Sequence, residues 1–204
     1  EALSYAWLNW KPILEVLRRD YPFFDELSKT IAELQSRYTA RKLSGNAVDF
    51  DDLLVFWLRL LREFSDIREI YQRRFQFLLV DEYQDTNRIQ SDLIDLLGAR
   101  HQNVTVVGDD SQSIYSWRGA HFLNILEFPK RYPKAQTFRI EVNYRSTPEI
   151  LAVANAAIKA NEKQFAKLLT SAQPSGPKPW LVACGDGQEQ AAFVAQRALQ
   201  LRDE

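Results

Sequence analysis

The chain has 204 residues, of which 46% are hydrophobic and 26% charged, so a packed core is feasible and wholesale disorder is excluded. Lys and Arg number 26 and Asp and Glu 27, which excludes a globally basic nucleic-acid binder but not a local basic groove. The sequence contains neither a run of about 18 apolar residues nor a secretion signal, so we expect no membrane partner and a cytoplasmic location. The absence of Met predicts a piece excised from a longer protein, or a processed start.

The first 75 residues predict helices. Apolar residues recur at helical spacing in Ile13–Leu17 and Leu27–Leu34, and they form a wide face from Leu53 to Phe64. Acidic residues crowd the first turn of this last helix, where the helix dipole favours negative charge: Asp49, Asp51 and Asp52.

A strand–helix–strand pattern follows. Phe77–Val80 is a short apolar run typical of a strand buried on both faces of a parallel sheet. A helix over Ile89–Leu97 leads to a second such strand, Val104–Val107, and Thr137–Val142 predicts a third. This alternation predicts an α/β fold.

The last part of the chain predicts two more helices and a strand. One helix begins at Ser146, where Ser146 and Glu149 fit a capping box, and runs to about Asn161. Trp180–Ala183 reads as a strand and Glu189–Leu201 as a closing helix.

Two acids follow the first predicted strand. Ligands of open α/β sheets gather at the carboxyl ends of the strands. Asp81 at such a tip can hold a hydrated Mg²⁺, and Glu82 beside it can orient or deprotonate an attacking water.

The second predicted strand ends in a glycine and a polar stretch that could sense a phosphate. Beyond it, Tyr115, Trp117 and Arg118 place two aromatic rings and a cation close together, which is the composition of a stacking platform for single-stranded bases. The alternative is that Trp117 belongs to the core and Arg118 is a surface charge.

The segment Asn143–Thr147 is the third candidate. Arg145 lies just before a helix, where it could place a bidentate guanidinium on a γ-phosphate. The alternative is a capped loop that carries a surface arginine.

Together, three segments closely resemble motifs II, III and IV of the UvrD/Rep/PcrA group of superfamily 1 DNA helicases: Val80–Asn87, Val107–Ala120 and Asn143–Thr147. Val48–Leu54 resembles the Asp-Phe-Asp-Asp-Leu string that precedes motif II in this family. The resemblance is close over residues 48–160, looser from 165 to 204, and one of character only over 1–47.

The resemblance implies ATP and Mg²⁺ as cofactors, and single-stranded DNA, or duplex with a single-stranded tail, as the partner. It implies a metal site at Asp81 and Glu82, with Glu82 activating water. It implies that Gln112 contacts the γ-phosphate, that Tyr144 stacks on adenine and that Arg145 is an arginine finger. DNA contacts would come from three residues of motif III: Tyr115, Trp117 and Arg118.

The implied fold is part of a RecA-like (P-loop NTPase) parallel sheet with flanking helices and a helical N-terminal part. Residues 1–47 would belong to a helical insertion of the first motor domain, 48–142 to the C-terminal part of the first RecA-like domain, and 143–204 to the start of the second.

None of the seven glycines is followed by Lys, so the chain contains no Gly-Lys-Ser/Thr phosphate loop. The expectation is therefore an internal fragment, itself inactive, of an ATP-dependent DNA helicase of the kind that acts in DNA repair. Two alternatives stay open: a truncated single-stranded DNA-binding module without ATPase activity, or a slice of a RecB/AddA-type helicase-nuclease.

Overall fold

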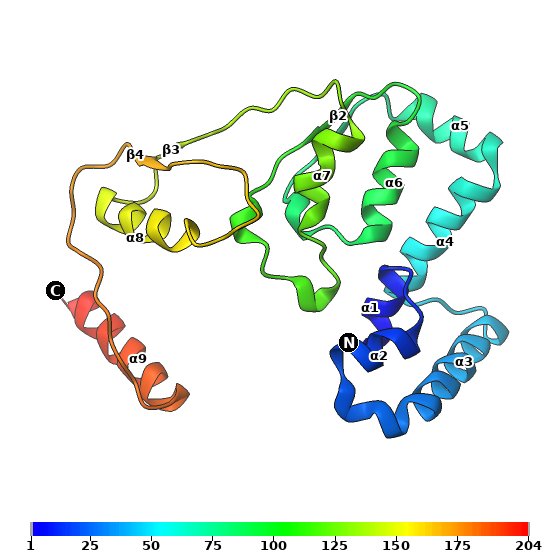
Figure 1. Cartoon of the computed structure of the whole chain (residues 1–204), viewed down its shortest axis with the longest axis horizontal. Coiled ribbons are helices and arrows are strands. Elements are labelled where there is room, and N and C mark those ends of the chain that lie inside the picture. The colour runs from blue at the N-terminus through cyan, green and yellow to red at the C-terminus, as the bar shows by residue number, and fades with distance from the viewer. Residues whose placement is uncertain (1, 204) are drawn as a thin grey trace. The chain divides into compact units, whose positions relative to one another are not determined.

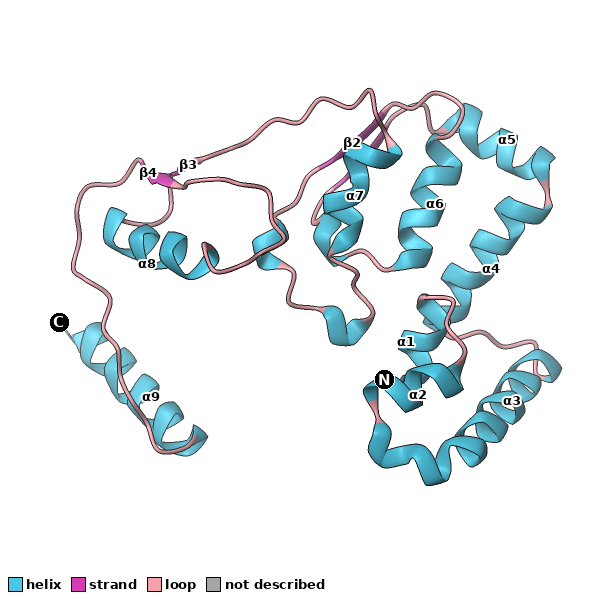
Figure 2. Cartoon of the chain, in the orientation of Figure 1, coloured by secondary structure: helices cyan, strands magenta, loops and turns pink. Residues whose placement is uncertain are grey.

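The computed structural model describes residues 2–203, apart from the side chain of Arg118, and it is rich in helices with small parallel sheets (Figure 1; Figure 2). The chain divides into two compact units. The first takes in the described residues up to Phe138 together with Lys163–Phe165, and the second the other described residues. Among residues 2–203, no helix is both long enough and apolar enough to cross a membrane.

The predicted helical character of the first 75 residues is confirmed. The helices of the first unit are α1 (Ala2–Leu8), α2 (Ile13–Asp20), α3 (Ser28–Ser44), α4 (Phe50–Glu63), α5 (Ser65–Arg74), α6 (Arg88–Gly98) and α7 (Leu123–Arg131). Single 3₁₀ turns or short 3₁₀ helices cover Pro22–Leu27, Tyr83–Asp85, Asp110–Gln112 and Ser116–Arg118.

The acidic start of α4 is a double cap. The Asp49 side chain accepts a hydrogen bond from the Asp52 N–H, and the Asp52 side chain accepts one from the Asp49 N–H, both at 3.0 Å. Lys42, in the last turn of α3, reaches both carboxylates at 2.7 and 2.6 Å. The Asp52 side chain is only 2% exposed, so α4 begins on a buried charge that Lys42 balances.

The main core of the first unit lies between α1, α4 and α6. Leu8 of α1 meets residues at helical spacing on α4 and α6 there: Val55, Leu58, Leu61, Ile89, Leu93 and Leu97. Each such side chain contributes about 1.5–3 kcal/mol when it is fully buried. This packing holds α6, which connects the two strands of the sheet.

The two expected strands are present and parallel. β1 (Leu78–Val80) pairs with β2 (Val104–Val106), with Leu78 opposite Val104. The prediction that these strands are buried on both faces is wrong, because Leu79 in the middle of β1 is 80% exposed. Only one face is packed, against a cluster that includes Tyr83, Ile125 and Phe128.

The second unit contains α8 (Pro148–Ile158) and α9 (Gly187–Asp203), and β3 (Val142–Asn143) pairs in parallel with β4 (Thr170–Ser171). The expected strand Thr137–Val142 is wrong except at its last residue. Trp180–Ala183 is not a strand either, and Leu181 is fully exposed at 100%. An apolar run becomes a strand only beside a partner ladder, and these segments pair with none among the described residues.

The capping box expected at Ser146 is wrong. The N-cap of α8 is Thr147, without a side-chain cap. Glu149 instead accepts hydrogen bonds from the Ser175 hydroxyl and, at 2.9 Å, from the Gly176 N–H. These bonds, that of Ser175 first, lower the pKa of Glu149 to about 2.

This shift predicts an acid-sensitive contact in the second unit. Because folding lowers the Glu149 pKa from 4.5 to about 2, its stabilising effect is complete above the higher value and is lost as the pH falls through the lower one. We expect the difference in melting temperature between wild type and Glu149→Gln to be largest above pH 5 and to vanish only below about pH 2. A pH-independent difference in circular-dichroism melts would contradict this.

Candidate functional site

The two strands of the first unit bring their carboxyl ends to one edge. Asp81 and Glu82 follow β1 directly, and Val107 follows β2. The Val107 N–H donates to the Val80 carbonyl at 2.8 Å, and the Val107 carbonyl accepts from the Tyr83 N–H at 2.9 Å. The segments beyond the strands therefore stay joined, as expected for a ligand-binding edge of an α/β sheet.

Two exposed carboxylates stand next to each other at this edge. The Asp81 side chain accepts a hydrogen bond from the Glu82 N–H at 2.9 Å. Glu82 adopts a left-handed backbone conformation with φ 48°, which is uncommon for a residue with a Cβ and tends to occur at functional sites. Both side chains are accessible to a ligand.

Gln84 connects the acids to the second strand end. It is only 1% exposed. Its Nε2 donates to Glu82 Oε2 at 2.7 Å, and its Oε1 accepts from the Asp109 N–H at 3.0 Å. Its backbone carbonyl also accepts from the Ser113 hydroxyl at 3.2 Å. One buried amide therefore fixes the acidic tip to the segment that follows β2.

The connection continues along that segment. The Asp109 carboxylate accepts from the Ser111 N–H and from Gln112 Nε2, each at 2.9 Å. Gly108 permits the close approach, since a Cβ there would lie 2.4 Å from Gln84 Oε1. A chain of hydrogen bonds therefore runs from Glu82 through Gln84 and Asp109 to Gln112.

A third carboxylate, Asp85, lies near Glu82 at this edge. Burial, and then the nearby Glu82 charge, raise the pKa of Asp85, and a long hydrogen bond from Gln84 opposes the shift. The Asp85 Oδ1 is buried and has no hydrogen-bond partner among the described residues.

Two aromatic rings stand at the far end of this segment. Tyr115 is 39% exposed and Trp117 is 52% exposed, with ring centroids 6.4 Å apart and planes at 50°. The alternative that Trp117 belongs to the core is therefore wrong. The side chain of Arg118 lies outside the described part of the structure.

The turn that carries Tyr115 and Trp117, called the aromatic turn below, is held to Asn9, just after α1, and to the turn after β1. Gly119 has φ 88°, and its carbonyl accepts from Asn9 Nδ2 at 3.3 Å. The His121 N–H donates to the Thr86 carbonyl at 3.0 Å, and buried Asn124 donates to the same carbonyl at 2.9 Å. The exposed rings are thus carried by a turn that is anchored at its end.

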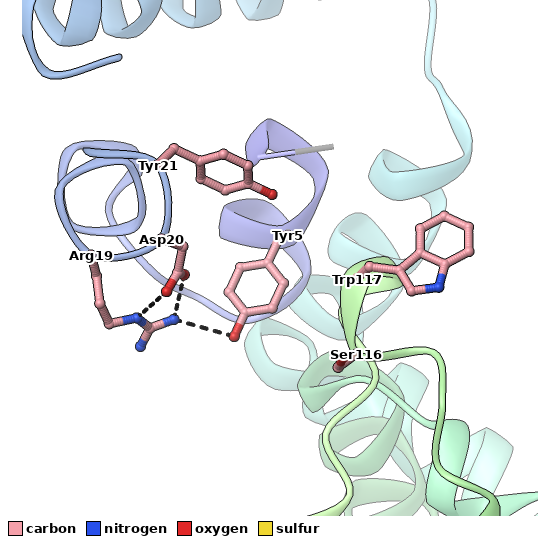
Figure 3. A pocket seen from close by; sticks show the side chains of 6 residues that line it. All are labelled: Tyr5, Arg19, Asp20, Tyr21, Ser116 and Trp117. Carbon is pink, nitrogen blue, oxygen red and sulfur yellow. Dashed lines mark hydrogen bonds and ion pairs between the residues drawn. The ribbon is translucent and has the colours of Figure 1, made fainter. Parts of the chain in front are cut away.

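A pocket of about 280 Å³ opens beside this turn (Figure 3). The first two helices and the aromatic turn line it with Tyr5, Arg19, Asp20, Tyr21, Ser116 and Trp117. The Arg19 guanidinium makes two hydrogen bonds of 2.6 Å to the Asp20 carboxylate. Residues more than 90 positions apart in sequence form this pocket, and no local motif marked it.

Buried polar contacts fix Tyr83, the residue that directly follows Asp81 and Glu82. Tyr83 is fully buried, and its hydroxyl accepts from Arg131 Nη2 at 2.5 Å. Arg131 also pairs with Asp95 at 2.8 Å, and Asp95 accepts from the Tyr132 hydroxyl at 2.9 Å. Sequence reasoning missed Arg131 and Asp95, which lie on helices without a recognisable motif.

Tyr144 and Arg145 belong to the second unit. Both are exposed, Tyr144 by 73%. The Asn143 side chain accepts from the backbone N–H groups of Arg145 and Ser146 at 2.9 and 2.7 Å, which shapes the turn before α8. The other candidate residues lie in the first unit, and each unit is described by itself.

Comparison with known proteins identifies the family. Residues 13–133 match the UvrD/REP helicase N-terminal domain, and residues 138–204 match the UvrD-like helicase C-terminal domain. The chain therefore belongs to the UvrD/REP helicase family, and the resemblance seen in its motifs is confirmed.

Three relatives carry the name ATP-dependent DNA helicase PcrA. The chain is 41% identical to that of Leuconostoc citreum over 175 residues, 86% of this chain and 23% of the relative. It is 41% identical to that of Staphylococcus aureus (strain Mu50) over 176 residues, 86% of this chain and 24% of the relative. It is 40% identical to that of Bacillus subtilis (strain 168) over 179 residues, 88% of this chain and 24% of the relative. The chain thus spans about a quarter of the length of these relatives.

Proposed function

We propose that this segment is part of an ATP-dependent DNA helicase that couples Mg²⁺-ATP hydrolysis to movement along single-stranded DNA. The observation that carries the proposal is the hydrogen-bond chain from Glu82 through Gln84 and Asp109 to Gln112. It joins the acids to the segment that presents Tyr115 and Trp117. A change at a bound nucleotide could reach the aromatic rings along this chain. The names of the relatives support the same activity.

In this proposal Glu82 is the general base. Its carboxylate is exposed at the strand end, and Gln84 holds one oxygen at 2.7 Å, so the other can accept a proton from water. Gln112, at the exposed end of the hydrogen-bond chain, contacts the γ-phosphate.

The residues at the edge fit a magnesium ion. Among the described residues, no group of three or more His, Cys, Asp or Glu side chains could hold a metal. Mg²⁺ needs only one or two carboxylates, because waters and substrate phosphates fill its other positions. Asp81 would supply a ligand, Glu82 beside it would add negative charge and stay free to act as the base, and the ion would neutralise charge on the phosphates.

Two residues of the second unit are also proposed to contact the nucleotide. Tyr144 is proposed to stack on adenine and Arg145 to act as the arginine finger, since both are exposed at the turn before α8. The two parallel strand pairs are proposed to be parts of two RecA-like sheets, with the division at residues 47 and 142 expected from the sequence. A cytoplasmic location and a role in DNA repair fit such an enzyme.

Trp117 tests the DNA contact. We expect Trp117→Ala to weaken binding of the 204-residue chain to single-stranded DNA by about 5- to 150-fold, because base stacking contributes about 1–3 kcal/mol. Fluorescence anisotropy of a labelled oligothymidylate measures this. Phe77→Ala removes an aromatic ring that is 72% exposed at the opposite end of β1 and serves as the control. Equal affinities for Trp117→Ala and wild type would overturn the contact.

A second candidate is a single-stranded DNA-binding module without ATPase activity. It is favoured by the exposed rings of Tyr115 and Trp117. ATP turnover by the 204-residue chain, abolished by Glu82→Gln, would exclude this candidate.

A further inference from the structure

Apart from Trp117, the residues that line the pocket have no part in the proposed nucleotide and stacking roles. Figure 3 shows Tyr5 standing between the Arg19–Asp20 pair and the turn that carries Ser116 and Trp117. The pocket volume of about 280 Å³ is several times the roughly 30 Å³ that a water occupies. A phosphate with its sugar can therefore enter it.

Two cations lie close to Tyr5, which is one of the residues that line the pocket. Arg19 Nη2 donates to the Tyr5 hydroxyl at 3.5 Å, and Lys11 Nζ lies 5.6 Å from the Tyr5 ring centroid. Asp20 contributes a carboxylate to the pocket lining. It accepts two hydrogen bonds of 2.6 Å from the Arg19 guanidinium. The Arg19 and Asp20 side chains are 50% and 35% exposed, and ion pairs as exposed as this contribute little to stability.

We infer that this pocket binds one backbone phosphate of the single strand that stacks on Trp117, with the Arg19 guanidinium exchanging Asp20 for the phosphate. The inference rests on the proposed function, which supplies the strand. Guanidinium binds phosphate and carboxylate in the same bidentate geometry, so the exchange keeps the side chain's hydrogen bonds. Asp20 then acts as a competitor of the DNA, and Lys11 adds a second positive charge.

This assignment predicts opposite effects from the two halves of one ion pair. Arg19→Gln removes the phosphate contact and weakens DNA binding. Asp20→Asn removes the competitor and a repulsive charge, and strengthens it. A merely structural ion pair behaves differently, because either substitution breaks the same bonds and moves the affinity in the same direction.

The experiment titrates a labelled oligothymidylate with the 204-residue chain at several salt concentrations, followed by fluorescence anisotropy. We expect Arg19→Gln to weaken binding several-fold. We also expect it to make the negative slope of log K against log salt shallower by about 0.7, the value for one phosphate on a single strand. We expect Asp20→Asn to tighten binding several-fold and Arg19→Lys to restore part of the affinity.

The exposed pair of Arg59 and Glu63 on α4 provides matched controls. Its atoms lie 3.3 Å apart and both side chains are 55% exposed. Arg59→Gln and Glu63→Gln repeat the two charge changes away from the pocket and should leave affinity near wild type. Circular-dichroism melts establish that every variant is folded.

The possible outcomes distinguish a failure of the pocket inference from a failure of the proposed DNA contact at Trp117. If Arg19→Gln and Asp20→Asn shift affinity in the same direction, or only as much as the α4 controls, the pocket inference is overturned while the Trp117 contact stands. If wild type binds no more tightly than Trp117→Ala, the proposed DNA contact itself fails, and the pocket inference falls with it.

Discussion

Glu82→Gln is expected to lower single-strand-stimulated ATP turnover by about 10²- to 10⁴-fold in the protein that carries this segment, the range that a general base contributes. The amide cannot accept the proton of the attacking water. It can still accept the 2.7 Å hydrogen bond from Gln84, so the buried link to Asp109 is preserved. The loss should therefore fall on kcat and leave DNA affinity close to wild type.

The measurement compares steady-state ATP turnover with oligothymidylate binding for the same preparation. Glu63→Gln on α4 is the control, because it makes the same chemical change at an exposed position. Retention of most of the turnover in Glu82→Gln would show that another group takes the proton. A matching loss of DNA affinity would show that Glu82 holds the segment after β2 in place and does not act chemically.

Lys42→Met is expected to destabilise the first unit by about 3 kcal/mol, the lower end of the cost of leaving a buried charge without its partner. Burial alone would lower the pKa of Lys42, but its hydrogen bonds to Asp49 and Asp52 raise it, so Lys42 is charged in the folded chain. Without the ammonium, the Asp52 carboxylate, 2% exposed, would keep only its backbone bond from Asp49.

Urea unfolding followed by the loss of the helical circular-dichroism signal measures this effect. Arg41→Met, on the neighbouring exposed residue of α3, is the control and should stay within about 0.5 kcal/mol of wild type. The double variant Lys42→Met/Asp52→Asn should regain much of the loss, since the buried charge is then gone. A single variant as stable as Arg41→Met would show that water or a shift of α3 satisfies Asp52.

Much of the first unit follows from local pattern. The apolar spacing of α4 and α6 and the short runs at Leu78–Val80 and Val104–Val106 predicted elements that the structure contains. The same reasoning erred wherever an element depends on a neighbour. Leu79 is exposed because no other element in the described chain covers that face of the sheet. Leu181 lies outside any strand because its segment pairs with no other strand among the described residues.

The candidate site also combines features that the sequence predicts with features that depend on tertiary contacts. Its residue types and their order along the chain were visible in the sequence, and their individual roles remain predictions. The buried position of Gln84 between Glu82 and Asp109 was not visible, because it depends on two strand ends meeting at one edge. Neither was the pairing of Lys42 with Asp52, which depends on how α3 runs into α4.

The sequence by itself determined the family, the helices, the two parallel strands and the nearly neutral charge of this chain, because these depend on composition, periodicity and short motifs. Only the tertiary structure decided that Trp117 is half exposed and that Tyr5 and Arg19 form a pocket beside it. The physical reason is that burial and long-range contact depend on which faces pack together, and residues far apart in the chain bring those faces into contact.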